Sequence, residues 1–277
     1  MIGGSVVGFL LIASLIGPLL SPYDADYYDV YNQLQGPNAS HWMGTDENGS
    51  DLLTLILRGG RVAFLVGLAV VCVSGTIGVI LGALAGYFRG KIDSLVMRTT
   101  DVILAFPGIL LAILIIFVTQ EPNLLSVILA LSSTGWAGYA RLTRGQVLAE
   151  RSKPYVEAAR AAGEREIRTL FRHVLPNCMA PVLIQATFGL AAAILAEASL
   201  SFLGLGPQDT PSWGALLDQG VSYFLLTPHL AIFPGIAIAL TVLGVNLLGD
   251  GLRDILDPKH ASNRALGRKQ RAVAGSE

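Results

Sequence analysis

The side chains that most often carry chemistry are scattered along this chain of 277 residues. The four histidines are His41, His173, His229 and His260, and none has a second histidine three or four positions away. The two cysteines, Cys72 and Cys178, fall in different apolar runs without a Cys-x-x-Cys spacing. A transition-metal site needs several such ligands close together. The sequence therefore predicts no metal site and no cofactor bound by this chain.

A phosphate-binding loop is a second kind of site that the sequence excludes. The pattern Gly-x-x-x-x-Gly-Lys-Ser/Thr, whose backbone amides surround phosphate groups, does not occur. The chain therefore cannot hydrolyse ATP by itself, and transport against a gradient would take its energy from a partner or from an ion. An ion-coupled secondary transporter usually shows buried charges and an inverted repeat, and no convincing internal repeat is present.

The composition indicates which structural elements the chain forms. Hydrophobic residues make up 52% of the chain, charged residues 14%, and the mean hydropathy is +0.58, whereas a soluble domain carries about a quarter charged residues. The charge-free runs are residues 1–23, 62–88, 102–120, 122–140, 173–196 and 219–249. Each is long enough to cross a bilayer as a helix, which takes about 20 apolar residues. The net charge of -1 also excludes a nucleic-acid binder with a basic groove.

The distribution of Lys and Arg predicts the orientation, because cytoplasmic loops near the ends of spans carry the positive excess. Segments 23–57 and 207–228 contain no Lys or Arg, whereas the segments after the second, fourth and sixth runs are basic. Among the 19 basic residues only Arg58 and Arg61 break this rule. We therefore expect an all-α polytopic membrane protein with six transmembrane helices and both termini in the cytoplasm.

These runs predict the organisation of the chain. Residues 1–22 form a first transmembrane helix, residues 23–60 a periplasmic loop, residues 61–258 a core of five transmembrane helices, and residues 259–277 a cytoplasmic tail. Within the core, residues 150–177 form a long cytoplasmic loop. A cleaved signal peptide is the alternative for the first run, but a basic start and a small-residue cleavage site are missing.

Two carboxylates fall at the edges of the predicted spans, where a charge is costly and usually functional. Asp101 lies near the inner end of the third span, and it either has a function or reaches the interface beside Arg98. Glu197 lies in the outer part of the fifth span, and it either takes part in helix packing or lines a substrate path. An intramembrane enzyme would need a paired nucleophile and base, which the sequence does not show.

Small residues and prolines mark the predicted spans in a second way. A stripe at intervals of four follows the second span: Ser74, Gly78, Gly82, Gly86 and Gly90. Such a stripe lets another helix approach closely, either within this chain's own bundle or from a partner subunit. Pro107 predicts a kink in the third span, and Pro234 predicts one in the sixth.

The segment 157–177, EAARAAGEREIRTLFRHVLPN, is the most distinctive part of the predicted cytoplasmic loop. Its alanine-rich start predicts a short helix that Gly163 ends with a positive φ. A second helix is expected over 164–175, ended by Pro176. Its apolar face would contain Ile167, Leu170, Phe171 and Val174. Two helices joined by a glycine would form a knob that docks in another protein; a passive amphipathic connector is the alternative.

This segment resembles the EAA motif of ABC importer permeases. The matching residues are Glu157, Ala158, Ala159, Gly163, Leu175 and Pro176. His173 stands where the general pattern has Ile, and the ending His173-x-Leu-Pro-Asn177 is similar to that of the dipeptide, oligopeptide and nickel branch. Residues 41–51 and 200–214 resemble outer motifs of the C-type permease of this branch, and residues 249–258 resemble the inner end of its last span. Ser50 departs from the branch, which commonly has Arg there.

The resemblance covers nearly the whole chain and implies the type I ABC importer (MetI-like) permease fold. It implies that the loop 150–177 carries the coupling helix, which sits in a cleft of the ATPase subunit. The residues implied in this coupling are Glu157, Ala158, Ala159, Gly163, His173, Leu175, Pro176 and Asn177. The chain would form half of the translocation pathway for short peptides. Nickel chelates or another small solute are the alternative cargo, and an ion-coupled secondary transporter is the remote alternative.

The same resemblance implies the partners and the location. They are a homologous B-type permease in a heterodimer, two ABC ATPases that bind ATP and Mg²⁺, and a periplasmic or lipid-anchored solute-binding protein. The chain would lie among the lipids of the bacterial inner membrane. The outer segments 23–57 and 207–228 hold Tyr27, Tyr28, Tyr31, Trp42 and Trp213. We expect these segments to cover the periplasmic mouth and touch the binding protein; anchoring at the membrane interface is the alternative for the aromatic residues.

Overall fold

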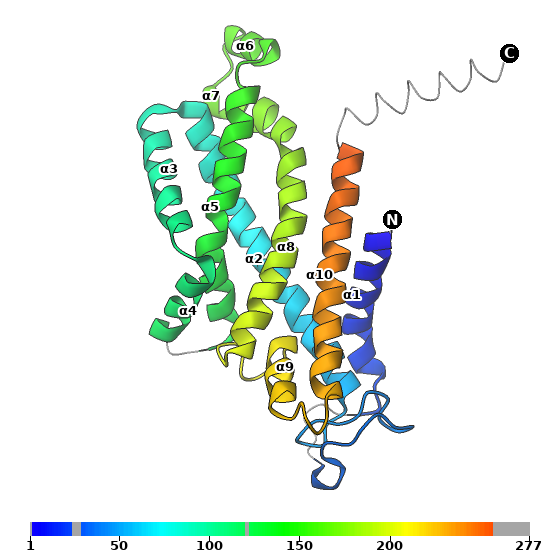
Figure 1. Ribbon diagram of the computed structural model, residues 1–277. Helices are drawn as coiled ribbons and strands as arrows, with labels where there is room; N and C mark the ends of the chain where they lie inside the picture. Colours follow the sequence, from blue (N-terminus) through cyan, green and yellow to red (C-terminus); the bar gives the residue numbers. More distant parts are fainter. Residues whose placement is uncertain (1, 24–28, 120–121, 257–277) are drawn as a thin grey trace, which may run out of the picture.

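The structure is a computed structural model that describes residues 2–23, 29–119 and 122–256. Within these residues the regular structure is helical, apart from an isolated bridge between Thr45 and Asp51. The long helices are α1 (Ile2–Leu20), α2 (Leu52–Phe88), α5 (Leu124–Glu150), α8 (Met179–Phe202) and α10 (His229–Leu256). Figure 1 shows them as one elongated bundle. The predicted tail 259–277, together with Tyr27, Tyr28 and His260, lies outside the described residues.

Shorter elements connect the long helices. They are η1 (Val30–Asn32), α3 (Gly90–Ala105), α4 (Gly108–Thr119), α6 (Pro154–Ala161), α7 (Glu166–Thr169), the π-helical turn η2 (Leu170–Val174), the 3-10 turn η3 (Leu175–Cys178) and α9 (Trp213–Ser222). Figure 1 shows α6 and α7 at one end of the bundle, and the loop 29–51 with α9 at the other. We call these the α6 end and the α9 end.

Length and apolarity identify four helical stretches that could cross a membrane. They are Gly3–Leu20, Leu52–Phe88, Glu166–Phe202 and His229–Leu256, with a fifth if α3 and α4 together form one span. α3 and α4 are bent by 89° where Pro107 breaks the helix, so the predicted kink is confirmed as a sharp break. α5 is a helix of 27 residues over the fourth predicted run, but three consecutive hydroxyl residues, at 132–134, lower its apolarity. The count of six spans stays a prediction.

Two element boundaries differ from the expected ones. α2 begins at Leu52, inside the expected loop 23–60, because the Asp51 side chain accepts a hydrogen bond from the Thr54 N–H at 2.9 Å and caps the helix. The sixth run is divided between two helices, since α9 ends at Ser222 and α10 begins at His229. Pro228 has no N–H to continue a helix, and it favours the first turn of a new one.

The glycine stripe explains how the centre of the bundle packs. α2 lies against α5 along its length. A Cβ on Gly78 would lie 2.4 Å from the Trp136 carbonyl oxygen, and one on Gly82 would lie 2.3 Å from that of Ala140. On Gly86 the distance to the Arg144 carbonyl oxygen would be 2.8 Å. The stripe therefore brings the backbones of two helices of the same chain together, which favours packing within the bundle over contact with a partner.

Arg61, an exception to the predicted charge rule, also has a structural partner. Pro18 lies inside α1, so the carbonyl of Ser14, four residues earlier, receives no helical N–H. Arg61 Nε donates to this carbonyl at 2.9 Å, and a second guanidinium nitrogen donates to the Leu15 carbonyl at 2.6 Å. The Arg61 guanidinium at the α9 end thus supplies the hydrogen bond that the proline takes away from the neighbouring helix α1.

Candidate functional site

The helix α6 presents the start of the predicted coupling motif at the surface. Pro154 begins the helix, where a missing N–H has no cost. Glu157 lies in the first turn, where the free N–H groups favour a carboxylate. Glu157 and Ala158 are exposed and Ala159 is half-buried, whereas Val156 on the other face is fully buried. One face of α6 therefore packs against the rest of the chain, and the opposite face is exposed.

Gly163 ends α6 in the left-handed conformation that the sequence predicted. Its φ is +79°. Its N–H donates to the Arg160 carbonyl at 2.9 Å, and the Glu164 N–H donates to the Ala159 carbonyl at 3.2 Å, so the last carbonyls of the helix have partners. A Cβ at this position would meet nothing within 4 Å. The requirement for glycine therefore comes from the backbone conformation and not from a neighbouring side chain.

The helix expected over 164–175 is not a separate element. The helical path runs from Glu166 through α7, η2 and η3 into α8 and ends at Phe202. The expectation that Pro176 ends a helix is therefore wrong. In the wide π turn before it, the Leu175 N–H donates to the Leu170 carbonyl. Pro176 then occupies the first turn of η3, where no N–H is needed.

The expected apolar face of this segment is divided between two surfaces. Leu170 and Val174 are fully buried, and they pack in one cluster with Val156 and Tyr87. Ile167 and Phe171 are 54% and 43% exposed. Five of the exposed residues at this end belong to or flank the motif and its apolar face: Glu157, Ala158, Gly163, Ile167 and Phe171. We call this set the knob.

Side chains in the last part of the motif make ion pairs and hydrogen bonds within the loop itself. Glu164 Oε2 lies 2.9 Å from His173 Nε2, and Glu164 Oε1 lies 3.1 Å from Arg168 Nε. Asn177 Nδ2 donates to the His173 carbonyl at 2.7 Å. Leu175 is half-buried, while Pro176 and Asn177 are exposed. The structure thus places His173 and Asn177 in one turn, where they contact the loop itself.

Tyr87, in the last turn of α2, is a central residue of this end that the sequence reasoning missed. Its side chain is 2% exposed. Its hydroxyl donates to Glu166 Oε2 and accepts a hydrogen bond from Arg160 Nε at 3.3 Å. The Arg160 guanidinium lies 5.1 Å from the centre of the Tyr87 ring. Tyr87 therefore joins α2 to both α6 and α7, and its position in the sequence predicts only an interfacial aromatic.

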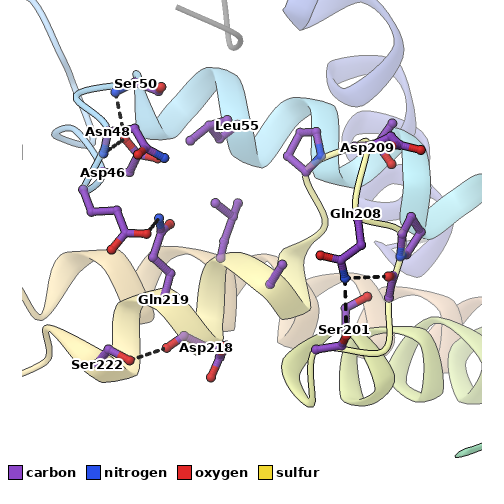
Figure 2. A pocket seen from close by; sticks show the side chains of 18 of the residues that line it. Asp46, Asn48, Ser50, Leu55, Ser201, Gln208, Asp209, Asp218, Gln219 and Ser222 are labelled. Atoms are coloured by element: carbon purple, nitrogen blue, oxygen red, sulfur yellow. Dashed lines mark hydrogen bonds between the residues drawn. The ribbon is translucent and has the colours of Figure 1, made fainter. Parts of the chain in front are cut away.

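A polar cavity of about 760 Å³ lies at the α9 end (Figure 2). We call it the outer cavity; it lies between the loop 46–50, the turn 204–211 and α9. Its acidic lining residues are Asp46, Glu47, Asp209 and Asp218, and no Lys or Arg of the described part of the chain lines it. Gln219 Nε2 donates to Glu47 Oε1 at 2.7 Å. Burial raises the pKa of Asp46, although the N–H groups of Ser50 and Asn48 oppose this shift. The cavity therefore favours positively charged groups.

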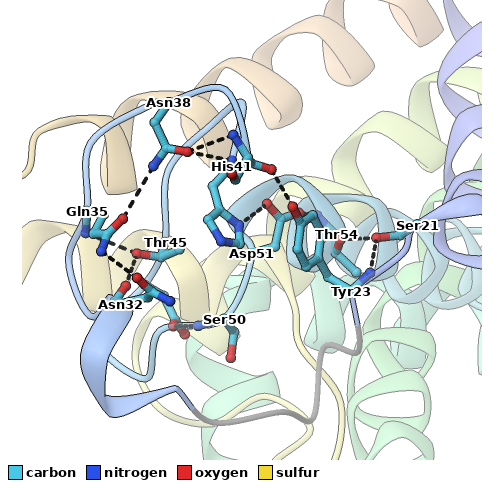
Figure 3. A network of polar contacts seen from close by, with 12 residues as sticks. Ser21, Tyr23, Asn32, Gln35, Asn38, His41, Thr45, Ser50, Asp51 and Thr54 are labelled. Carbon is cyan, nitrogen blue, oxygen red and sulfur yellow. Dashed lines mark hydrogen bonds and ion pairs between the residues drawn. The ribbon is translucent and has the colours of Figure 1, made fainter.

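The loop 29–51 is folded onto the start of α2 by a polar network (Figure 3). Asp51, which caps α2, has its Oδ1 3.0 Å from His41 Nδ1, and the ring of Tyr23 packs 4.6 Å from the His41 ring. Within the loop, the Gln35 N–H donates to Thr45 Oγ1 at 3.0 Å. Tyr31 and Trp42 are 96% and 75% exposed. Of the aromatic residues expected to touch a binding protein, these two are open to a partner.

Trp213 has a different position from the one expected. Its side chain is 2% exposed, and its Nε1 donates to the Ile56 carbonyl at 2.7 Å. A Cβ on Gly59 would lie 2.8 Å from Trp213 Cδ1, and one on Gly60 would lie 3.0 Å from Cζ2. Trp213 itself is therefore not open to a partner, because two glycines of α2 form a slot that takes the indole ring into the core. Contact of the outer segments with a binding protein stays a prediction.

The two carboxylates near the predicted spans have partners within the chain. Asp101 on α3 pairs with Arg141 on α5 at 2.5 Å, and both side chains are more than half exposed. Glu197 is fully buried, and Ser201 Oγ donates to its Oε1 at 2.7 Å. Its Oε2 has no hydrogen-bond partner among the described residues. The bond to Ser201 lies within α8, and a role in a substrate path stays a prediction for both carboxylates.

Metal ligands do not gather in the described part of the chain. No group of three or more His, Cys, Asp or Glu residues there is arranged to hold a metal ion. Cys72 and Cys178 are free thiols, the first exposed and the second buried. That the chain binds no cofactor stays a prediction.

Comparison with protein families gives two matches. Residues 78–261 match the family described as binding-protein-dependent transport system inner membrane component. Residues 1–37 match the family described as N-terminal TM domain of oligopeptide transport permease C. The two matches cover the long helices from α1 to α10 except for most of α2.

Curated relatives match nearly the whole chain. The glutathione transport system permease protein GsiD of Pectobacterium atrosepticum is 43% identical over 258 residues, covering 92% of this chain and 85% of that protein. The dipeptide transport system permease protein DppC of Alkalihalophilus pseudofirmus is 41% identical over 264 residues, covering 93% and 86%. Among solved structures, a chain of the inward-facing MetNI methionine ABC transporter matches with a TM-score of 0.60 at 18% identity, covering 73% of this chain and 96% of that one. This last likeness concerns the fold alone.

Proposed function

We infer the role of this chain from the premise that it belongs to the family of binding-protein-dependent transport system inner membrane components. It is a membrane permease subunit of an ABC transporter and not the ATPase. We propose that it forms half of the translocation pathway of an ATP-driven importer for short peptides. The proposal that the cargo is a short peptide rests on one observation. Relatives matching more than 90% of this chain are named for a dipeptide and for glutathione, itself a short peptide.

The proposed topology has six spans with both termini in the cytoplasm of a bacterial inner membrane. The start of α1 lies beside the last turns of α10, since a Cβ on Gly3 would lie 2.5 Å from the Leu248 nitrogen. The start of α1 and the end of α10 therefore point toward the α6 end (Figure 1). α5 and the bent pair α3 and α4 supply the remaining two spans. The basic residues of the α6 end support a cytoplasmic position.

The knob is the proposed contact with an ATPase subunit. It combines a carboxylate, Glu157, with two exposed apolar side chains, Ile167 and Phe171, and this combination suits a groove in another protein. The outer cavity and the exposed Tyr31 and Trp42 are the proposed contacts with a solute-binding protein. A homologous B-type permease would cover the exposed apolar side chains of α4, among them Leu110, Leu114 and Phe117.

The proposed mechanism follows from the two-ended geometry. ATP binding closes the ATPase subunits, which displaces the knob, and the spans then change between inward-facing and outward-facing states. This chain's own part is to hold the knob in a fixed shape and to open or close the outer mouth. No chemical step on the cargo is required.

Uptake assays test the cargo. Cells lacking the gene are supplied with labelled di- to hexapeptides and with nickel, and uptake is compared with that of the complemented strain. Lost peptide uptake with normal nickel uptake supports the proposal, whereas the reverse result would establish nickel chelates as the cargo. Purification of the complex without any ATPase subunit would instead favour an ion-coupled secondary transporter.

A further inference from the structure

We propose that Tyr87 is a positioning residue through which the knob moves α2, and that α2 carries this movement to the outer cavity. The inference rests on the proposed function and adds to it a route between the two ends of the chain.

The inner contact joins three elements at one side chain. The Tyr87 hydroxyl bonds to Glu166 of α7 and to Arg160 of α6, and Arg160 Nε lies 3.3 Å from Glu166 Oε2. Arg151, which follows α5, donates to the Tyr87 carbonyl and lies 5.7 Å from the ring centre. The ring itself is buried in the apolar cluster beneath α6. A displacement of α6 or α7 therefore acts directly on the last turn of α2.

α2 is suited to transmit such a displacement over a long distance. It contains 37 residues without a proline, which corresponds to about 55 Å at a rise of 1.5 Å per residue. At its other end Leu55 lines the outer cavity, and the Ile56 carbonyl accepts the bond from Trp213 of α9. One continuous helix, α2, thus contacts α6 and α7 at one end and lines the outer cavity at the other.

Two other helices, α8 and α5, also run from the α6 end and could transmit the movement, but each has a feature that makes it less suitable. α8 continues from the loop and reaches the outer cavity with Ser201, but the π turn and the 3-10 turn interrupt its hydrogen-bond ladder. α5 is tied to the loop by the Tyr155 hydroxyl, which donates to Glu150 Oε1 at 2.5 Å. Its outer end, at Leu124 and Leu125, lines a different cavity. Tyr155 therefore provides a matched control.

The test compares Tyr87→Phe with Tyr155→Phe in the complete transporter reconstituted into vesicles with its binding protein. Each change removes one hydroxyl that donates to a carboxylate and keeps the ring. We expect Tyr87→Phe to lower the peptide imported per ATP hydrolysed by about ten-fold, a size typical of changes within a coupling network. Basal ATP hydrolysis and retention of the ATPases should not change. Tyr155→Phe should stay within about two-fold of the wild type, because it leaves the α2 contact intact.

A second variant guards against a folding defect. Glu166→Ala removes a side chain that is 54% exposed, so the buried cluster is untouched. It should lower the import ratio as Tyr87→Phe does, and the double variant should be no worse than either single one because both remove the same contact. A wild-type ratio in Tyr87→Phe, an equal loss in Tyr155→Phe, or loss of the ATPases from the Tyr87→Phe complex would each overturn the inference. Failure of the proposed function is distinct: wild-type vesicles would then show no ATP-driven peptide import.

Discussion

The two ends of α2 are held by contacts of different kinds. At the α9 end the contacts are buried: the Trp213 indole fills a slot formed by two glycines, and Asp51 caps the helix while facing His41. At the α6 end Tyr87 is buried, but the groups that bond to its hydroxyl are charged and partly exposed, Arg160 by 29% and Glu166 by 54%. Two separate apolar clusters support these arrangements, one around Trp213 and one around Tyr87.

This difference indicates which end is free to move. A packed indole with a hydrogen bond has one arrangement, and leaving it costs both the packing and the hydrogen bond of the indole N–H. Exposed ion pairs contribute only about 0–1 kcal/mol each and exchange partners with water. We therefore expect the α9 end of α2 to be a fixed joint and the α6 end to be an adjustable one.

The largest effect is expected from Trp213→Ala, which removes the fixed joint. The change leaves a cavity and removes the bond from the indole to the Ile56 carbonyl, so we expect the free energy of unfolding to fall by about 3–5 kcal/mol. Thermal unfolding of the purified complex measures the loss. Trp42→Ala is the control, since Trp42 is 75% exposed, and it should change stability by less than about 0.5 kcal/mol. Equal melting temperatures for the two variants would show that the joint does not depend on Trp213.

Gly163→Val tests the adjustable end. A β-branched side chain opposes the positive φ at a cost of about 1 kcal/mol or more, which should tilt the segment after Gly163 and misplace the knob. We expect normal abundance in the membrane, weakened copurification of the ATPases and lost transport. Gly204→Val is the matched control, because Gly204 has a φ of +75° and no neighbour within 4 Å but lies at the α9 end. ATPase loss in both variants would argue against a specific role of the knob.

Glu157→Lys tests the charge of the knob and should have a smaller effect on the fold. Reversal of the charge in the first turn of α6 costs about 0.3–1 kcal/mol, so the helix should persist while binding of the ATPases weakens. Copurification and peptide uptake measure the result. Glu157→Gln removes the charge without reversing it and should lie between the wild type and Glu157→Lys. Wild-type uptake and ATPase retention in both Glu157→Lys and Gly163→Val would make the loop a passive connector.

The smallest effect is expected from Asp46→Asn in the outer cavity. Burial raises the pKa of Asp46, so the folded chain favours the neutral form more than the unfolded chain does. The wild type is therefore relatively most stable below the unfolded pKa of about 3.9 and loses this contribution as the pH rises through the folded value. Asp46→Asn should be slightly more stable than the wild type at pH 7. Melting curves at several pH values measure this gap, and a gap that widened on acidification would contradict the prediction.

Much of the local structure could be predicted from the sequence because its causes are local. Apolar runs indicated α1, α8 and α10, and Pro107 indicated the break between α3 and α4. Gly163 indicated the left-handed turn. The prediction for Pro176 was wrong because the chain passes through a π turn just before it, so Pro176 falls in the first turn of η3, where no N–H is needed.

The residues that join elements could not be predicted in the same way. Arg61 breaks the charge rule, and only the tertiary structure shows that its partner is the carbonyl that Pro18 leaves free. Tyr87 and Trp213 are both aromatic residues near the ends of helices, and their positions in the sequence do not distinguish their roles. One lies in the joint below the knob, and the other lies in a slot within the core.

The sequence by itself determined the class of protein, the main apolar helices and the loop that bears the motif, because hydrophobicity and backbone preferences act over neighbouring residues. Only the tertiary structure decided which polar groups meet. The bond between Tyr87 and Glu166 spans 79 positions, and that between Trp213 and Ile56 spans 157. Such contacts depend on how whole helices pack, so the physical information that selects them is not local to any part of the chain.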